Sequence, residues 1–449
     1  MTSRRDALKL AGLGVGALTV GSGTANAATR SKTLYSTSVE HARGRAYAPG
    51  RAGSDYTPVE TPNGSTLPFK IKDGVKIFHL IAEEVEHEFA AGLAGRCWGY
   101  NGRVHGPTIE AVEGDRVRVY VTNRLPAATS LHWHGVILNS GMDGVSGLNQ
   151  RAINPGETFV YEWTFQQYGT FMYHSHHDEM TQMAMGLIGM IVVHPRRPAE
   201  PAPDRDFALM LSTWMMRPGE RRPDPNEMSD FNILTINGKA YPATAPLVAR
   251  TGQRVRIRIG NLSAMHHHSI HLHGYAFEET MTDGGLVPVS ARRPETTTLV
   301  PVGATRTVDF VADNPGDWAM HCHMTHHVMN QMAHGGANML GVDPAAFEGR
   351  IASLLPAYMA MGQNGMGDMG EHIESGHMAV PDNSLPMVGS QGPHGYISMG
   401  GMFTILKVRD AITDFTNPGW YSDPVGTARP ATVEELSRDG VNLADGQTE

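Results

Sequence analysis

The sequence predicts an all-β protein with two tandem Greek-key β-sandwich domains and a C-terminal extension rich in Met, His and Gly. Short β-prone runs recur from Val75 onwards and are separated by Gly-rich turns, which is typical of sandwich domains. The pattern restarts after a Pro-rich stretch at 195–206. Residues 114–135 and 252–274 both contain Gly-x-Arg-Val-Arg, then Asn, a loop and His-x-His-Gly, which indicates a duplicated domain.

In chain order, residues 1–27 have the features of an export signal. Arg4 and Arg5 precede an apolar run at 10–20, and an Ala-Asn-Ala sequence at 25–27 supplies a small-residue cleavage site. Paired arginines are typical of the twin-arginine route. We therefore expect export to the periplasm or the outside of the cell. No other apolar run approaches the ~18 residues of a membrane span.

The remaining residues divide by composition and strand pattern. The predicted parts are an N-terminal arm at 28–72, a first sandwich at 73–196, a second sandwich at 205–345 and the extension at 346–449. Within the extension, methionines alternate with glycines and histidines over 351–402, a composition that cannot form a dense core by itself. A last strand-like run at 402–410 is predicted to return to the second sandwich.

Composition limits the classes of function. The chain has 449 residues, 18% of them charged, and a formal net charge of −9, which argues against nucleic acid or an anionic membrane as partner. It contains 23 histidines and 26 methionines, two residue types whose side chains can bind copper. We predict no disulfide between its two cysteines, Cys97 and Cys322. Cys97 is most simply a small buried residue.

One stretch, AMHCHMTHHVMNQM, combines a thiol with imidazoles and a thioether. Cys322, His327 and Met332 are spaced as three of the ligands of a blue electron-transfer copper, which needs a second imidazole from elsewhere. His268 is our candidate for that imidazole. The alternative is a buried free cysteine at the end of a His-rich strand.

Paired histidines indicate further metal ions. In each His-x-His pair both side chains lie on one face of a strand, and eight imidazoles are enough for three copper ions. Each predicted domain contributes two pairs, and Ser175 of the first domain stands where the second has Cys322. We therefore expect no blue copper in the first domain. The paired histidines are His132, His134, His174, His176, His271, His273, His321 and His323.

These clusters resemble the copper motifs of the multicopper oxidases. So do GYNGRVHGPTIEAVEGDRVRVYVTN, YHSHHDEMTQMAMGLIGMIVVHP and LTINGKAYPATAPL around them, and the resemblance covers roughly residues 75–345. The stretch between His176 and His268 is too short for the extra domain of three-domain laccases. The chain therefore resembles the two-domain, small-laccase-like branch, which implies cupredoxin domains and four coppers per subunit: one type 1, one type 2 and a type 3 pair.

The resemblance also implies a role for each ligand. His132 and His271 would bind the type 2 copper, and the other six paired histidines the type 3 pair. Ser269 and Tyr275 replace a proline and a histidine that relatives often have, and His326 stands where some copper-efflux oxidases have an acid. We expect Asp143, in MDGVSG, to supply protons instead, although an Asp-Gly turn explains it equally well.

The implied activity is a laccase-like one. Phenols or aromatic amines would lose single electrons, and Cys322 would pass them to His321 and His323 for the four-electron reduction of O₂ to water. Oxidation of Cu(I) or Mn(II) is the alternative substrate class, while a copper nitrite reductase and a non-catalytic copper store are alternatives of other kinds. Two-domain relatives close the cluster between subunits, which implies a homotrimer.

Overall fold

The computed structural model describes residues 47–330 except 218 and 230, together with 383–385, 389–422 and 427–442. Of the stretch between 331 and 382 it describes only two short paired strands, β21 (Met339–Leu340) and β22 (Met359–Ala360). The predicted export signal, Met332 and most of the Met-rich stretch lie outside the described residues. Among the described residues, no helix is long and apolar enough to cross a membrane.

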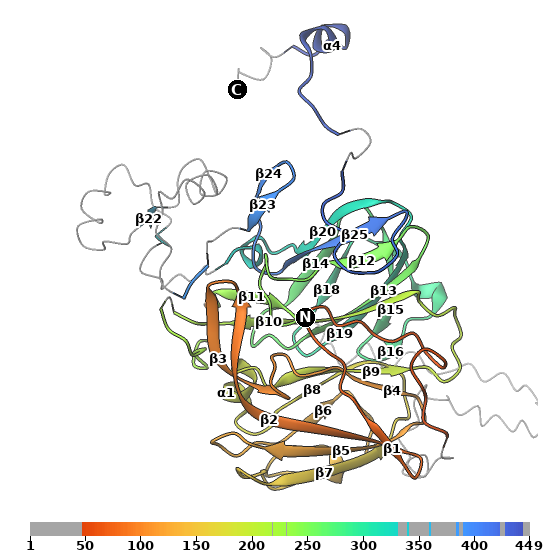
Figure 1. Ribbon diagram of the computed structural model, residues 1–449, viewed down its shortest axis with the longest axis vertical. Helices are drawn as coiled ribbons and strands as arrows, with labels where there is room; N and C mark the ends of the chain where they lie inside the picture. The colour runs from red at the N-terminus through yellow and green to blue at the C-terminus, as the bar shows by residue number, and fades with distance from the viewer. Residues whose placement is uncertain are drawn as a thin grey trace, which may run out of the picture. The chain divides into compact units, whose positions relative to one another are not determined.

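The first sandwich consists of two facing sheets (Figure 1). One sheet contains β1 (Lys70–Lys72), β2 (Val75–Ala90), β3 (Leu93–Tyr100), β5 (Arg116–Asn123) and β7 (Thr158–Thr164). The other contains β4 (Ile109–Val112), β9 (Ile188–His194), β8 (Gly169–His174) and β6 (His132–His134), and helix α1 (Glu179–Ala184) follows β8. The apolar residues of β5 alternate with polar ones, so that Val117, Val119 and Val121 fill the core between the sheets.

The second sandwich repeats this arrangement. Its first sheet contains β11 (Ile233–Ile236), β10 (Arg205–Trp214), β13 (Arg254–Asn261), β19 (Thr305–Val311), β15 (Phe277–Thr282), β16 (Gly285–Leu286) and β17 (Pro294–Glu295). The facing sheet contains β12 (Leu247–Arg250), β25 (Phe403–Arg409), β20 (Gly316–Cys322), β14 (His268–Leu272) and β18 (Thr297–Val300). The predicted strand at 402–410 is thus confirmed: β25 pairs with β20 and β12. A hairpin, β23 (Ser390–Gly392) and β24 (Gly395–Ile397), and helix α4 (Val433–Arg438) lie outside these sheets.

Strand pairing confirms the predicted duplication. The parallel pair β2–β5 has its counterpart in β10–β13, and β4–β9 in β12–β25. His132 of β6 lies opposite His174 of β8, and His271 of β14 lies opposite His321 of β20. The duplicated sequence pattern therefore places equivalent histidines at equivalent points of two sheets.

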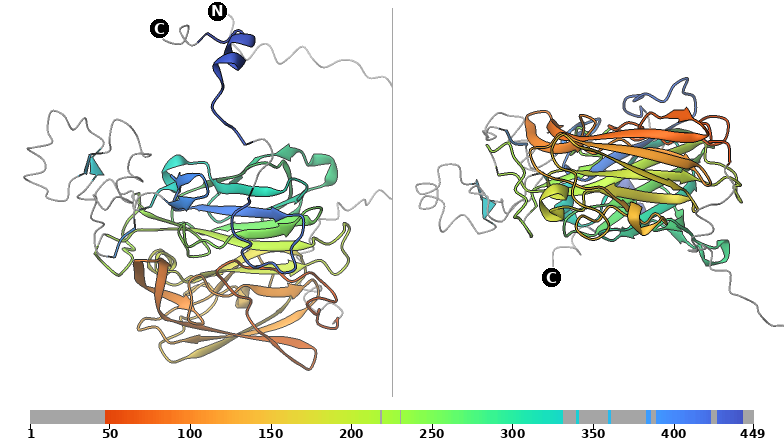
Figure 2. Two further views of the ribbon diagram at one scale, coloured as in Figure 1. Left: turned by 45° about the horizontal axis from the view of Figure 1, so that its top comes forward. Right: turned by 90° about the horizontal axis from the view of Figure 1, so that it is seen from below.

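The two sandwiches pack against each other through the sheet that contains β8 and β9 and the sheet that contains β10 and β13. The four sheets thus form successive layers in Figure 1 and in the left view of Figure 2. Every residue of β9 is buried, because one face meets the first core and the other packs against the second sandwich. A buried ion pair lies at this junction: Arg258 donates two hydrogen bonds to Asp206 at 2.7 and 2.8 Å, and a third to Thr170 of β8 at 3.1 Å. The domain boundaries at 73–196 and 205–345 remain predictions.

Candidate metal centres

His268, Cys322 and His327 form a buried cluster in the second sandwich. Neighbouring strands β14 and β20 position the first two, and the 3₁₀ helix η4 (Thr325–Val328) positions His327. The Sγ atom of Cys322 lies 3.7 Å from Nδ1 of His268 and 3.4 Å from Nδ1 of His327. The two Nδ1 atoms are 3.2 Å apart. One sulfur and two nitrogens therefore converge on a single point, as a copper ion would need.

Surrounding groups orient this cluster. Nε2 of His268 lies 2.7 Å from Oγ of the buried Ser263, an arrangement in which the Nε2–H donates and Nδ1 keeps its lone pair toward Cys322. Burial lowers the pKa of His327 to about 4 and the pKa of His268 well below its usual range. Burial also raises the pKa of the Cys322 thiol. The metal-free cluster is therefore neutral, and a metal ion must displace the thiol proton.

The paired histidines of the first sandwich also gather together. Their ring centroids lie 5.2–6.0 Å apart, with Nδ1 of His134 3.3 Å from Nε2 of His174. Backbone carbonyls hold the opposite ring nitrogens: His132 donates to Asp143 at 2.9 Å, and His174 to Ser175 at 2.8 Å. Such hydrogen bonds fix the tautomer and leave the other nitrogen free for a metal. We call His132, His134, His174 and His176 the first half-cluster.

A second half-cluster contains His271, His273, His321 and His323. Its ring centroids lie 4.8–5.7 Å apart, and Nε2 of His273 is 3.2 Å from Nε2 of His321. His271 donates from Nδ1 to the carbonyl of Thr296 at 2.7 Å. His321 donates from Nδ1 to the carbonyl of Cys322 at 2.9 Å, so the buried thiol and this half-cluster share one stretch of backbone.

The two half-clusters do not meet within the chain. Where the structure describes the side chains, no imidazole of the first half-cluster makes a ring contact or hydrogen bond with one of the second. The first half-cluster contacts the second sandwich through His134, whose Nε2 donates to the carbonyl oxygen of Gly303 at 2.9 Å. One chain therefore presents two incomplete sets of four imidazoles.

Asp143 lies beside the first half-cluster. Its Oδ1 is 3.5 Å from Nδ1 of His132, and it directly follows the 3₁₀ helix η2 (Ser140–Met142). Gly144 has a φ of +89°, and a Cβ there would lie 1.7 Å from the Leu131 carbonyl oxygen, so the Asp-Gly turn also has a structural reason. A second carboxylate, Glu179, is not among the residues predicted from the sequence, and it lies 3.6 Å from His174 and 3.6 Å from His176.

The first sandwich has hydrogen-bonding side chains where the second has its thiol and imidazoles. Oε1 of Gln182 accepts from Thr129 at 2.7 Å and from Ser175 at 2.5 Å, and its amide donates to the carbonyl of Ala128 at 2.8 Å. All of these side-chain groups are buried. In the repeated pattern Thr129 corresponds to His268 and Ser175 to Cys322, so this is the counterpart of the buried cluster.

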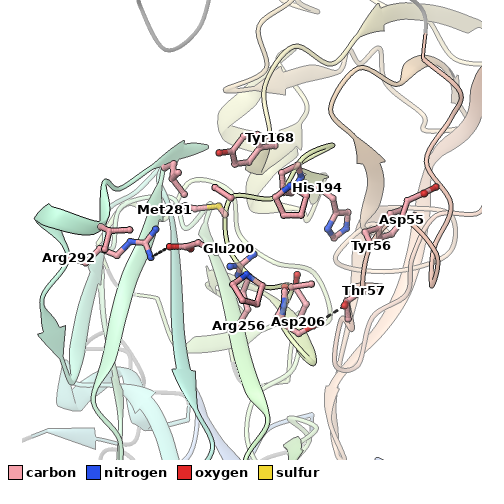
Figure 3. A pocket seen from close by; sticks show the side chains of 18 residues that line it. Asp55, Tyr56, Thr57, Tyr168, His194, Glu200, Asp206, Arg256, Met281 and Arg292 are labelled. Atoms are coloured by element: carbon pink, nitrogen blue, oxygen red, sulfur yellow. Dashed lines mark hydrogen bonds and ion pairs between the residues drawn. The ribbon is translucent and has the colours of Figure 1, made fainter.

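A separate cavity of about 180 Å³ lies beside the stretch that joins the sandwiches (Figure 3). Tyr56 stacks on His194 with centroids 4.1 Å apart, and Arg292 donates to Glu200 at 2.7 Å. Nε2 of His194 also lies 3.1 Å from the buried Glu110. None of the predicted ligands lines this cavity, so the candidate centres lie elsewhere.

Comparison with known proteins identifies the class. Multicopper oxidase sequence profiles match residues 82–198 and 217–338. The chain belongs to the multicopper oxidase family, and its two sandwiches are cupredoxin domains. Copper resistance protein A of Escherichia coli is 28% identical over 65% of this chain and 55% of its own length. The chain spans about half the length of the curated relatives it matches first, 55% and 41%.

Solved structures give the same class. A blue copper oxidase from Nitrosomonas europaea has a TM-score of 0.55 and 26% identity, and the match covers 74% of this chain and 85% of that one. The multicopper oxidase mgLAC has a TM-score of 0.56 and 25% identity, over 81% of this chain and 94% of that one. The expected family and fold are thus confirmed.

Proposed function

We propose that this protein is an exported copper oxidase that takes electrons singly from phenols or aromatic amines and delivers them to O₂. One observation carries the proposal: the buried Cys322 joins two imidazoles on one side, while its chain neighbours His321 and His323 belong to the second half-cluster. Because alternate residues of a strand face opposite ways, one cysteine lies between two metal sites. A protein that only stored copper would not need this connection.

The side chains fit copper, and copper would supply the redox chemistry. His268, Cys322 and His327 would hold the blue copper, and the two half-clusters would hold the ions that reduce O₂ with four electrons and four protons to two waters. The chain itself contributes burial, which excludes water from Cys322, and carbonyl acceptors, which fix the histidine tautomers. Asp143 and Glu179 would hold or pass protons beside the first half-cluster, which their distances of 3.5 Å to His132 and 3.6 Å to His176 support.

The separation of the half-clusters supports a homotrimer. If the first half-cluster of one subunit meets the second half-cluster of the next, the contact is heterologous and must close into a ring or continue as a filament. Three-fold closure would give three complete clusters and four coppers per subunit. Light-scattering mass measured beside copper content tests this assembly. An active monomer with four coppers would refute it.

The activity is tested by oxygen uptake with the copper-loaded protein. A phenol, Cu(I) and Mn(II) are supplied in turn, and we expect uptake of one O₂ for every four phenol molecules oxidised. The loaded protein should be blue, and Cys322→Ser should abolish the colour while the half-clusters keep their copper. A colourless protein with full copper content would contradict the assignment.

Oxidation of Cu(I) is the second candidate. It is favoured by relatives named copper resistance protein A and by the exposed thioethers of Met228, Met265 and Met324 in the second sandwich, since soft sulfur binds Cu(I). Deletion of residues 359–399 should then slow Cu(I) oxidation more than phenol oxidation. Equal losses would leave phenols as the better assignment. Nitrite reduction is disfavoured, because Ser175 replaces the thiol that such a protein needs in its first domain.

A further inference from the structure

The ring of His327 is covered by a second imidazole. His266 stacks on it with centroids 4.7 Å apart and an interplanar angle of 20°. His268 and Cys322 are fully buried, and His327 is only 9% exposed. His266 is half-buried, so the stacked pair joins the buried ring of His327 to a partly exposed ring.

His266 is held in place by a segment distant in sequence. The edge of the buried Phe231 side chain meets its ring at 5.1 Å and 83°. The turn that precedes Phe231 is itself fixed, because Oε1 of Glu227 accepts from the amides of Met228 and Ser229 at 2.9 and 2.8 Å. The stacked geometry is therefore built from several contacts and is not the chance position of a free surface side chain.

The duplicated domain supplies an internal comparison. Aligning Ser269 with Ser130 in the repeated pattern places Ala127 opposite His266 and Thr129 opposite His268. The first sandwich, which has Ser175 in place of Cys322, thus lacks both the buried imidazole and the ring that covers it. The covering ring occurs in the domain that has the thiol.

We propose that His266 is a positioning residue for electron uptake: a reductant docks against its outer edge, and the electron crosses the stacked pair His266–His327. The inference rests on the proposed function. Each reductant loses one electron; a phenol also releases its proton to water, whereas Cu(I) releases none. Four electrons, four protons and one O₂ then give two waters.

The stack matters because electron transfer slows steeply as the gap between donor and acceptor widens. His266→Ala would replace a conjugated ring in contact with His327 by a space the width of that ring. His266→Phe keeps a flat ring at the same position but has no ring nitrogen. His267→Ala is the matched control, since this exposed neighbour accepts from the amide of Val302 at 3.0 Å and makes no ring contact with His327.

The test is anaerobic stopped-flow bleaching of the blue band in the copper-loaded full chain. We expect His266→Ala to slow bleaching about tenfold with both a phenol and Cu(I). His266→Phe should restore most of the rate, and His267→Ala should leave it unchanged. The blue band, the copper content and the reduction potential should match the wild type in all three variants.

The outcomes separate this inference from the proposed function. A wild type that is colourless, or that no reductant bleaches, overturns both. A blue wild type whose bleaching rate survives His266→Ala overturns only the role of His266. Loss of the band or a shifted potential in His266→Ala and His266→Phe alike would show that the ring merely supports His327, which also overturns it.

Discussion

Ser263 should control how tightly the buried cluster binds copper. Its hydroxyl is the hydrogen-bond partner of His268 Nε2, at 2.7 Å, and both side chains are buried. Ser263→Ala removes the acceptor and leaves the imidazole N–H without a partner in a site that water does not reach. The side chain of His268 then loses the contact that turns Nδ1 toward Cys322.

The size of the effect follows from that unpaired group. A buried donor without a partner costs about 1–3 kcal/mol. Because about 1.4 kcal/mol is a factor of ten, copper affinity should fall by roughly 5- to 150-fold if the full cost acts on the copper-bound state. Loss of a hydrogen bond behind a ligating histidine typically costs about 10- to 100-fold in metal affinity, in the same range.

The assay is competitive copper titration followed by the blue band. Ser146→Ala is the matched control, since its hydroxyl lies 3.0 Å from Nδ1 of His177, which is not a predicted ligand. We expect weaker binding and a broadened blue band in Ser263→Ala, and wild-type values in Ser146→Ala. Unchanged affinity and spectrum in Ser263→Ala would refute the reasoning.

Two further predictions concern the metal-free protein. Gln182→Ala removes the acceptor that the buried hydroxyls of Thr129 and Ser175 share and leaves them only longer hydrogen bonds. It should lower the free energy of unfolding by about 1–3 kcal/mol in urea, with unchanged stability as the contradicting result. Burial lowers the pKa of His87 to about 4, so this histidine binds a proton more readily in the unfolded chain than in the folded one. The contribution of neutral His87 to the free energy of unfolding is complete above about pH 6.5 and is lost as the pH falls toward 4. At pH 5 the loss is about 2 kcal/mol. His87→Gln should remove this acid sensitivity in urea titrations, whereas the same change at the exposed His79 of the same strand should not.

The fold could be predicted because its signals are local. Alternation in β5 and the repeated Gly-x-Arg-Val-Arg pattern each lie within a few residues, and they determine strand type and duplication directly. The pairs His132–His134 and His271–His273 could also be placed on strand faces, because period two is a property of the strand itself.

Other parts of the site depend on contacts between distant segments. Phe231, which packs against His266, belongs to a loop whose path no local pattern determines, and Gln182 meets Thr129 from the helix after β8. Glu179 could have been predicted from the sequence, since it follows Ser175 by four residues, as His326 follows Cys322. The predicted proton role of Asp143 and the ligand role of Met332 remain predictions.

Comparison of the two domains shows which face of the strands duplication preserved. On the outer face, which is the strand face turned away from the core of its own domain, both sandwiches keep the same cross-strand pairing, His132 with His174 and His271 with His321. On the inner face the chemistry has diverged, because hydrogen bonds around Ser175 replace the donor set around Cys322. The shared outer face is what the proposed cluster would require, since each domain would contribute four imidazoles to it. In the proposed function one thiol is enough for electron uptake, so the first domain can have a hydrogen-bonded core at the position equivalent to Cys322.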